Sequence, residues 1–207
     1  MQTSERMWLS RVRGLIAVAG MLVSPLLASA IEGLEAPGPD PKFAQELRLF
    51  GQLVGDWDLR ISNRQDDGSW AEVAGEWHFG WILNGRAIQD VWIAYKPDSK
   101  PGDPSGYLGY GTTVRVYDEK QHIWHVNWMG VLTHTYLRFR AHAVGSEIVM
   151  DATDSDGTPI QWIFSDIGSD RFLWRSQASP DGGKTWRVDQ RMTATRRRSY
   201  RWFPCRR

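Results

Sequence analysis

A chain of 207 residues, 42% of them hydrophobic and 24% charged, is long enough for one globular domain with a sizeable core, and a second domain would be cramped. A single cysteine, Cys205, excludes an intrachain disulfide, so the core must supply the stability. The net charge of +1 is concentrated in an arginine-rich end after Thr195, which leaves the body of the chain mildly acidic, and we expect no nucleic-acid partner.

The first 30 residues predict a secretory signal peptide. Basic residues precede an apolar stretch over 14–27, and Ala28-Ser29-Ala30 provides the small-x-small pattern for cleavage before Ile31. The stretch is too short for a comfortable membrane span, so we expect a periplasmic or secreted protein without stable membrane insertion after cleavage. An uncleaved anchor is one alternative, and a cytoplasmic protein with a misassigned start site is the other.

Residues 31–40 read as a Pro/Gly linker, and a short helix follows. Asp40-Pro41 pairs an N-cap acid with a proline at the first helical position. Phe43, Leu47 and Phe50 then fall at i, i+4 and i+7 and form one apolar stripe, before Gly51 ends the helix. We expect this helix to cap one end of the fold.

From Gly55 onward apolar and polar residues alternate, which predicts strands. Turn-forming pairs separate them, and Asn84-Gly85 is the strongest because a type I′ turn needs positive φ at both central residues. The segment 97–107 is long enough to be a mobile loop, either a surface excursion or a lid. Ten strands are expected, at 55–64, 70–83, 86–96, 108–117, 122–130, 132–143, 146–153, 158–166, 171–179 and 185–197.

Consecutive strands joined by short loops predict an all-β fold, a roughly ten-stranded antiparallel up-and-down barrel within residues 41–197. Closure removes exposed strand edges. Ten strands enclose more space than the eight whose side chains nearly fill a barrel, so a cavity is expected. The chain's twelve tryptophans would give that barrel an unusually aromatic interior.

The hairpin around Asn84-Gly85 contains the first candidate site residue. A two-residue loop pairs Phe79 with Asp90 and Trp77 with Trp92, so one aromatic face surrounds a lone carboxylate. We take this face as the interior of the barrel. A carboxylate in such surroundings must be paired, hydrogen-bonded or protonated.

The next hairpin offers a partner for that carboxylate. If residues 118–121 form its loop, Arg115 lies opposite Trp124, on the interior face. Arg115 would then neutralise Asp90 across the interior or anchor an anionic ligand. In an enzyme, Asp90 would be the general acid or base, with Arg115 or His125 as its electrostatic partner.

Two hypotheses account for the aromatic interior. In one, the tryptophans fill the core and Asp90–Arg115 is a buried ion pair. In the other, aromatic walls and a few polar groups form a ligand pocket. The ligand-binding residues would then be Trp77, Phe79, Asp90, Trp92, Arg115, Trp124, Trp128, Trp162, Trp174 and Gln190.

No metal ion or cofactor is expected. The five histidines lack metal-ligand spacing, and a lone histidine bound to haem is the one cofactor alternative. Residues 179–186 fit the Asp-box pattern S-x-D-x-G-x-x-W, but the pattern occurs once, which favours a simple turn. The aspartates 151, 154 and 156 lack the other ligands of a calcium loop.

The motifs together resemble a known family. The segment Leu53-Val54-Gly55-Asp56-Trp57 is similar to the G-x-W start of calycin-type barrels, where the tryptophan packs across the barrel base, and Gly85-Arg86 and the turn at 179–186 follow in order. Residues 45–197 thus resemble an uncharacterised bacterial lipocalin-like (calycin-type) β-barrel family. The resemblance implies a ten-stranded calycin-like barrel. Nitrobindin-type haem-binding barrels are distantly similar, but their ligand histidine has no counterpart here.

The leading functional prediction is an exported barrel that binds a small hydrophobic or aromatic ligand in a tryptophan-lined cavity. One alternative is a lyase, isomerase or cyclase of a small hydrophobic substrate, with Asp90 as general acid or base. Others are a haem-binding barrel and a cell-envelope interaction module that uses the basic tail 198–207. The sequence leaves the oligomeric state open.

Overall fold

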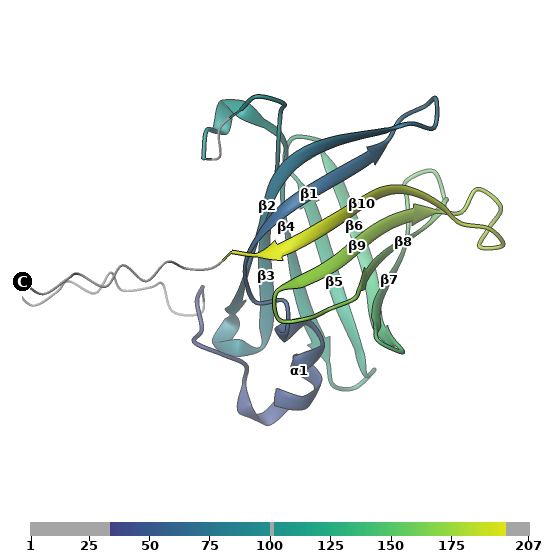
Figure 1. Ribbon diagram of the computed structural model, residues 1–207. Coiled ribbons are helices and arrows are strands. Elements are labelled where there is room, and N and C mark those ends of the chain that lie inside the picture. Colours follow the sequence, from purple (N-terminus) through teal and green to yellow (C-terminus); the bar gives the residue numbers. More distant parts are fainter. Residues whose placement is uncertain (1–33, 100–101, 198–207) are drawn as a thin grey trace, which may run out of the picture.

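The protein is a closed antiparallel β-barrel with one short helix at its end, as a computed structural model shows (Figure 1). The structure describes residues 34–99 and 102–197. The predicted signal peptide and the basic tail with Cys205 therefore lie outside the described residues. Within them, no helix combines the length and apolar character that a membrane-spanning helix requires.

Each strand pairs with its neighbours in the chain, and β1 closes the barrel by pairing with β10, which confirms the predicted topology. Strand β6 starts three residues later than predicted, because Val131 to His134 form a turn in which His134 adopts a φ of 53°. The strands are β1 (Gly55–Arg64), β2 (Trp70–Ile82), β3 (Ala87–Tyr95), β4 (Tyr107–Asp118), β5 (Ile123–Gly130), β6 (Thr135–Val144), β7 (Glu147–Thr153), β8 (Pro159–Ser165), β9 (Arg171–Ala178) and β10 (Arg187–Arg196).

The turn between β2 and β3 forms as predicted. Asn84 and Gly85 have φ values of 53° and 80°, and the Arg86 amide donates to the Leu83 carbonyl at 3.0 Å. The predicted register follows, because Phe79 pairs with Asp90 and Trp77 with Trp92. The aromatic face of this hairpin points into the barrel, where Trp77 and Phe79 are buried.

The predicted register between β4 and β5 was wrong by two residues. Arg115 pairs with Val126, not with Trp124. Strand β4 runs on to Asp118, whose carboxylate accepts hydrogen bonds from the amides of residues 120 and 121 in the turn. Since side chains alternate with a period of two, a slip of two residues keeps Arg115 on the interior face.

The predicted helix is present as a 3-10 turn, η1 (Pro41–Phe43), and α1 (Ala44–Gly51). The Asp40 side chain caps η1 by accepting from the Lys42 amide at 3.0 Å. All three stripe residues are buried, and α1 lies across the barrel end at which β1 begins (Figure 1). This end is called the capped end below, and the opposite end is called the open end.

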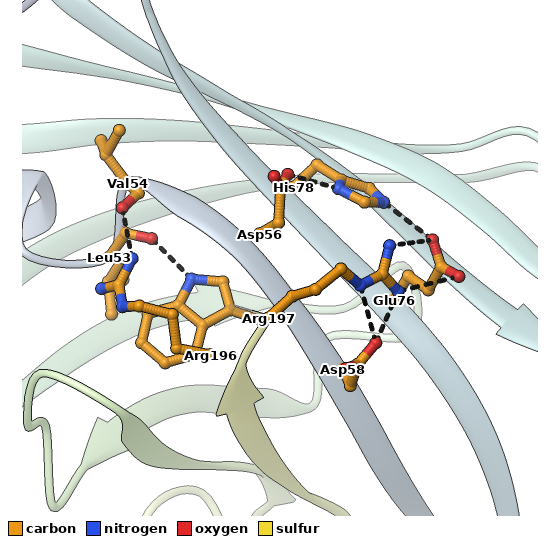
Figure 2. Close-up of polar contacts among 9 residues, drawn as sticks. Leu53, Val54, Asp56, Asp58, Glu76, His78, Arg196 and Arg197 are labelled. Atoms are coloured by element: carbon orange, nitrogen blue, oxygen red, sulfur yellow. Dashed lines mark hydrogen bonds and ion pairs between the residues drawn. The ribbon is translucent and has the colours of Figure 1, made fainter. Parts of the chain in front are cut away.

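Trp57 closes the base of the barrel, as the resemblance implied. Its indole N–H donates to the Leu53 carbonyl at 2.7 Å, and its ring packs edge-on against Phe172. The Arg196 guanidinium lies 4.0 Å from the ring centroid and donates to the Val54 carbonyl (Figure 2). The last strand is thereby tied to the first.

Arg197 makes a second tie at the same place. It bonds Asp58 and Glu76 on β1 and β2, and Glu76 also contacts His78 (Figure 2). The first two arginines after Thr195 therefore belong to the barrel.

Candidate functional site

The half of the barrel next to α1 is filled by side chains. Phe50 packs against Trp124 at a centroid distance of 4.9 Å and against Phe164 at 6.3 Å. Phe79 packs against Trp77 at 5.0 Å. Trp124 and Phe79, both predicted as ligand-binding residues, therefore belong to the packed core of the capped end.

Asp90 and Arg115 form the predicted pair inside this packed region. Oδ2 of Asp90 lies 2.6 Å from Nη1 of Arg115, and neither side chain is more than 1% exposed. The Thr113 amide donates to the other carboxylate oxygen at 2.9 Å. Burial raises the pKa of Asp90 above that of an ordinary aspartate, while Arg115 and the Thr113 amide act in the opposite direction.

The pair is incompletely hydrogen-bonded. Nε of Arg115 and the Thr113 hydroxyl are buried without a hydrogen-bond partner among the described residues. The Arg115 guanidinium lies 5.2 Å and 5.3 Å from the ring centroids of Phe50 and Phe79, which partly compensates its charge. Neither Asp90 nor Arg115 lines the cavity described next.

A cavity of about 220 Å³ occupies the open half of the barrel. Six of the ten predicted ligand-binding residues line it, and the other four are the Asp90–Arg115 pair and the two aromatic residues of the capped end. The lining residues are Trp77, Trp92, Trp128, Thr133, Thr135, Trp162, Trp174, Gln190 and Met192.

The indoles of the cavity wall are held edge to face. Ring centroids are 6.0 Å apart for Trp92 and Trp128, 5.7 Å for Trp128 and Trp162, and 5.4 Å for Trp162 and Trp174. Glycines on β4 make room for these rings, since a Cβ atom at Gly109 would lie 2.6 Å from the Trp92 ring. The wall is therefore a continuous aromatic surface of fixed orientation.

Two indole N–H groups of this wall are buried without a hydrogen-bond partner among the described residues, those of Trp77 and Trp174. The Trp77 N–H lies close enough to the Asp90 carboxylate to contribute to lowering its pKa, but does not reach full hydrogen-bond geometry. Trp92, in contrast, donates to the Met192 sulfur at 3.4 Å. Trp174 is thus a lining residue whose buried indole N–H has no protein partner among the described residues.

Three lining residues were not predicted. Met192 lies two residues after Gln190 on β10, so strand alternation alone could have identified it. Thr133 and Thr135 lie at the β5–β6 turn, in a segment predicted as continuous strand. Only the turn brings both threonines to the cavity, and no pattern in the sequence signals it.

Comparison with known proteins finds similar folds among solved structures. No protein-family model matches the chain, and no curated protein matches it. Among solved structures, the chain is similar to Rv2717c from M. tuberculosis, with 13% identity, a TM-score of 0.51, and coverage of 75% of this chain and 99% of that one. The fold is that of a calycin-like barrel.

A second structure is similar at a lower TM-score. The S-type phycobiliprotein lyase CPES from Guillardia theta shares 14% identity, with a TM-score of 0.49 and coverage of 73% of this chain and 92% of that one. At such identities a likeness concerns the fold alone, so the calycin-like site must be interpreted from its own residues.

The histidines do not reach the cavity of this calycin-like barrel. His125, predicted as a partner of Asp90, lies on the outer face of β5, where its Nε2 contacts Asp118 at 3.3 Å. His78 and His142 contact outer carboxylates at 2.7 Å and 3.7 Å. The described residues contain no cluster of three side chains suited to a metal ion.

The Asp-box segment forms the predicted turn. The Asp181 carboxylate accepts hydrogen bonds from the Thr185 amide at 2.8 Å and the Lys184 amide at 3.1 Å, and also from the Ser179 hydroxyl. These bonds lower the pKa of Asp181 to about 2. The segment therefore shapes the β9–β10 connection at the open end.

Proposed function

We propose that this protein binds a small aromatic molecule that carries a hydrogen-bond acceptor, in the cavity of the open half. One observation supports this most strongly: five indoles surround a space that other side chains leave empty, and one of them, Trp174, has a buried N–H without a protein partner among the described residues. Aromatic walls with few polar groups are typical of small-molecule sites.

The cavity volume limits the size of the ligand. Sites for drug-sized molecules span roughly 300–1,000 Å³, and this cavity measures about 220 Å³. One ring or two fused rings fit such a space. Edge-to-face contacts with the indoles would then provide affinity and orientation.

The unpaired donor determines the chemistry of the ligand. An indole N–H donates and cannot accept, so its partner must be an acceptor such as a carbonyl oxygen. A buried donor without a partner costs about 1–3 kcal/mol, and a ligand that accepts from Trp174 recovers that energy. An aromatic ketone or a related carbonyl compound meets both requirements.

Haem fits this site poorly. An axial ligand is needed, and none of the described residues that line the cavity is a histidine or a cysteine. The space is also smaller than that of an ordinary drug-sized site. Haem binding, which the distant similarity to nitrobindin-type barrels suggested, therefore stays an untested prediction.

The acid–base alternative requires Asp90 to reach the ligand. A catalytic acid or base must come within hydrogen-bond distance, about 3 Å, of the proton that it transfers, and Asp90 lies in the packed region outside the cavity lining. Asp90→Asn separates the two functions. A binding protein keeps its ligand affinity in this variant, whereas an acid–base enzyme loses turnover by orders of magnitude.

Two matched ligands test the proposal, indane and 1-indanone, which differ by one carbonyl group. Calorimetric titration of the wild type should show saturable binding of both, with 1-indanone tighter by about fivefold to tenfold, as one recovered hydrogen bond implies. Trp174→Phe should keep indane binding and lose the preference. Trp70→Phe, on the outer wall, is the matched control and should keep both.

Absence of saturable binding across a broad panel of one- and two-ring compounds would overturn the proposal. Saturable binding of indane and 1-indanone with equal affinity would leave the apolar pocket standing and remove the role of the Trp174 donor.

We also propose export, on the basis of the signal-like residues 1–30, which lie outside the described residues. Sequencing the N-terminus of the protein purified from the periplasm should find Ile31 first. An envelope-interaction role of the tail is tested by deleting residues 198–207, which should then release the protein from its partner.

A further inference from the structure

We propose a second binding site, on the outer wall of the barrel, for a small anion that carries an apolar body. A groove of about 540 Å³ runs over β1, β10 and β9. It is called the outer groove below. Among its lining residues, those that carry the argument are Arg60, Ser62, Trp70, Leu173, Arg191 and Thr193.

The polar residues of the outer groove lie on the outer face of the barrel, whereas the tryptophan cavity is inside it. On β1 the side chain of Ile61 is buried inside the barrel, so its neighbours Arg60 and Ser62 point outward. On β10 Met192 is buried inside, so Arg191 and Thr193 point outward as well. Trp174 and Met192 contribute to the lining of both, so the outer groove and the cavity lie next to each other at the β9–β10 part of the barrel wall.

Two arginines of the outer groove, Arg191 and Arg175, lie side by side on neighbouring strands. Arg191 on β10 pairs directly with Arg175 on β9, an arrangement that is destabilising for like charges. Arg175 is neutralised by Glu147, with N–O distances of 2.9 Å and 3.4 Å. Arg191 instead lies over the ring of Trp70, 4.0 Å from its centroid.

The outer groove therefore carries more positive charge than its acidic neighbours neutralise. Within residues 34–99 and 102–197, neither Arg60 nor Arg191 forms an ion pair, whereas Arg86, Arg115, Arg175 and Arg197 do. Glu72 is the acidic residue of the lining, and its carboxylate accepts from the Ser62 hydroxyl at 3.1 Å. Two guanidinium groups on adjacent strands are thus left for an anion.

The outer groove offers both polar and apolar surface, which suits a ligand with an anionic group and an apolar body. Thr193 pairs with Arg60 across β1 and β10, and its hydroxyl can donate to an anionic oxygen, whereas the Ser62 hydroxyl donates to Glu72. Leu173 and Val188 provide apolar surface beside them. Guanidinium groups bind carboxylate or phosphate oxygens in pairs, which favours such an anion between Arg60 and Arg191.

Phenyl phosphate is the probe, with benzyl alcohol as its neutral counterpart. Calorimetric titration of the full chain at about 50 mM salt should show saturable binding of phenyl phosphate, and this binding should weaken as the salt concentration is raised. Benzyl alcohol should bind much more weakly. The variant Arg60→Gln/Arg191→Gln should bind phenyl phosphate about tenfold or more weakly.

Arg138→Gln/Arg140→Gln is the matched control, because these arginines lie on the outer face of β6, away from the outer groove. It should leave the affinity unchanged, and circular dichroism should confirm folding of both variants. Saturating 1-indanone should not displace phenyl phosphate, which separates this site from the cavity.

Vesicles of phosphatidic acid in phosphatidylcholine distinguish a membrane headgroup from a free anion. Binding to the vesicles without binding of phenyl phosphate would overturn a small-molecule site. Equal losses in the two double variants, or no saturable binding of phenyl phosphate, would overturn it as well.

Discussion

In the capped half of the barrel, Trp57 is fully buried and its N–H donates to the Leu53 carbonyl at 2.7 Å. In the open half, Trp174 is almost as deeply buried, yet its N–H has no partner among the described residues. The first indole is satisfied by the protein itself, and the second adjoins an empty space. The same residue type thus fills the core at one end and lines a cavity at the other.

The difference between the halves comes from what enters each of them. At the capped end, α1 places Phe50 and Leu47 in the interior of the barrel, and both are buried. At the open end no element takes that position among the described residues, and the rim consists of turns such as Val131 to His134. A barrel of ten strands is wide enough to need such a plug, and it receives one at a single end.

The largest expected effect on stability comes from removing one tryptophan from each half of the barrel. Trp57→Ala should lower the free energy of unfolding by about 3–5 kcal/mol, because a large cavity forms in a packed region. Trp128→Ala, at the wall of an existing cavity, should cost only about 1–2 kcal/mol but abolish binding of 1-indanone. Urea unfolding measures both, and equal costs would contradict the comparison.

The buried ion pair of the capped half should be nearly as sensitive. Asp90→Ala leaves the Arg115 guanidinium buried without its carboxylate, which should lower the free energy of unfolding by about 3–5 kcal/mol. Asp90→Leu/Arg115→Met removes both charges and should recover most of that loss. A double variant less stable than the single one would show that the pair itself stabilises the fold.

The pH dependence of stability follows from the same residue. Because burial raises the pKa of Asp90 in the folded state, the folded protein holds this proton more tightly than the unfolded chain does. Relative to Asp90→Asn, the wild type should therefore lose stability as the pH rises from about 4, the ordinary aspartate value, through the raised pKa. Denaturant unfolding of both proteins at several pH values measures the difference, and the opposite slope would contradict it.

The smallest expected effect lies at the rim of the open end. The pKa of Asp181 is lowered to about 2, so the turn that it caps is stabilised above about pH 4 and loses this stabilisation as the pH falls through 2. The protection of the Lys184 and Thr185 amides against hydrogen exchange, relative to the intrinsic rate at each pH, should fall over that range. The protection of the Val54 and Leu53 amides at the capped end should stay unchanged.

The sequence predicted the parts of this molecule that depend on local alternation. The strand order, the turn at Asn84-Gly85 and the interior positions of Asp90 and Arg115 all follow from side-chain period and turn chemistry. Six lining residues of the cavity followed in the same way.

What could not be predicted depends on contacts between distant segments. The β4–β5 register depends on how Asp118 caps its turn and on a positive φ at His122. The location of the empty space depends on which end α1 enters. No local pattern distinguishes Trp124, which packs against Phe50, from Trp128, which faces the cavity.

The indole region of a ¹H–¹⁵N spectrum gives the most direct test of the central claim. With peaks assigned from Trp174→Phe and Trp57→Phe variants, titration with 1-indanone should shift the Trp174 N–H signal downfield and leave that of Trp57 in place. A Trp174 signal that stays in place at saturation, or equal movement of both signals, would contradict the account.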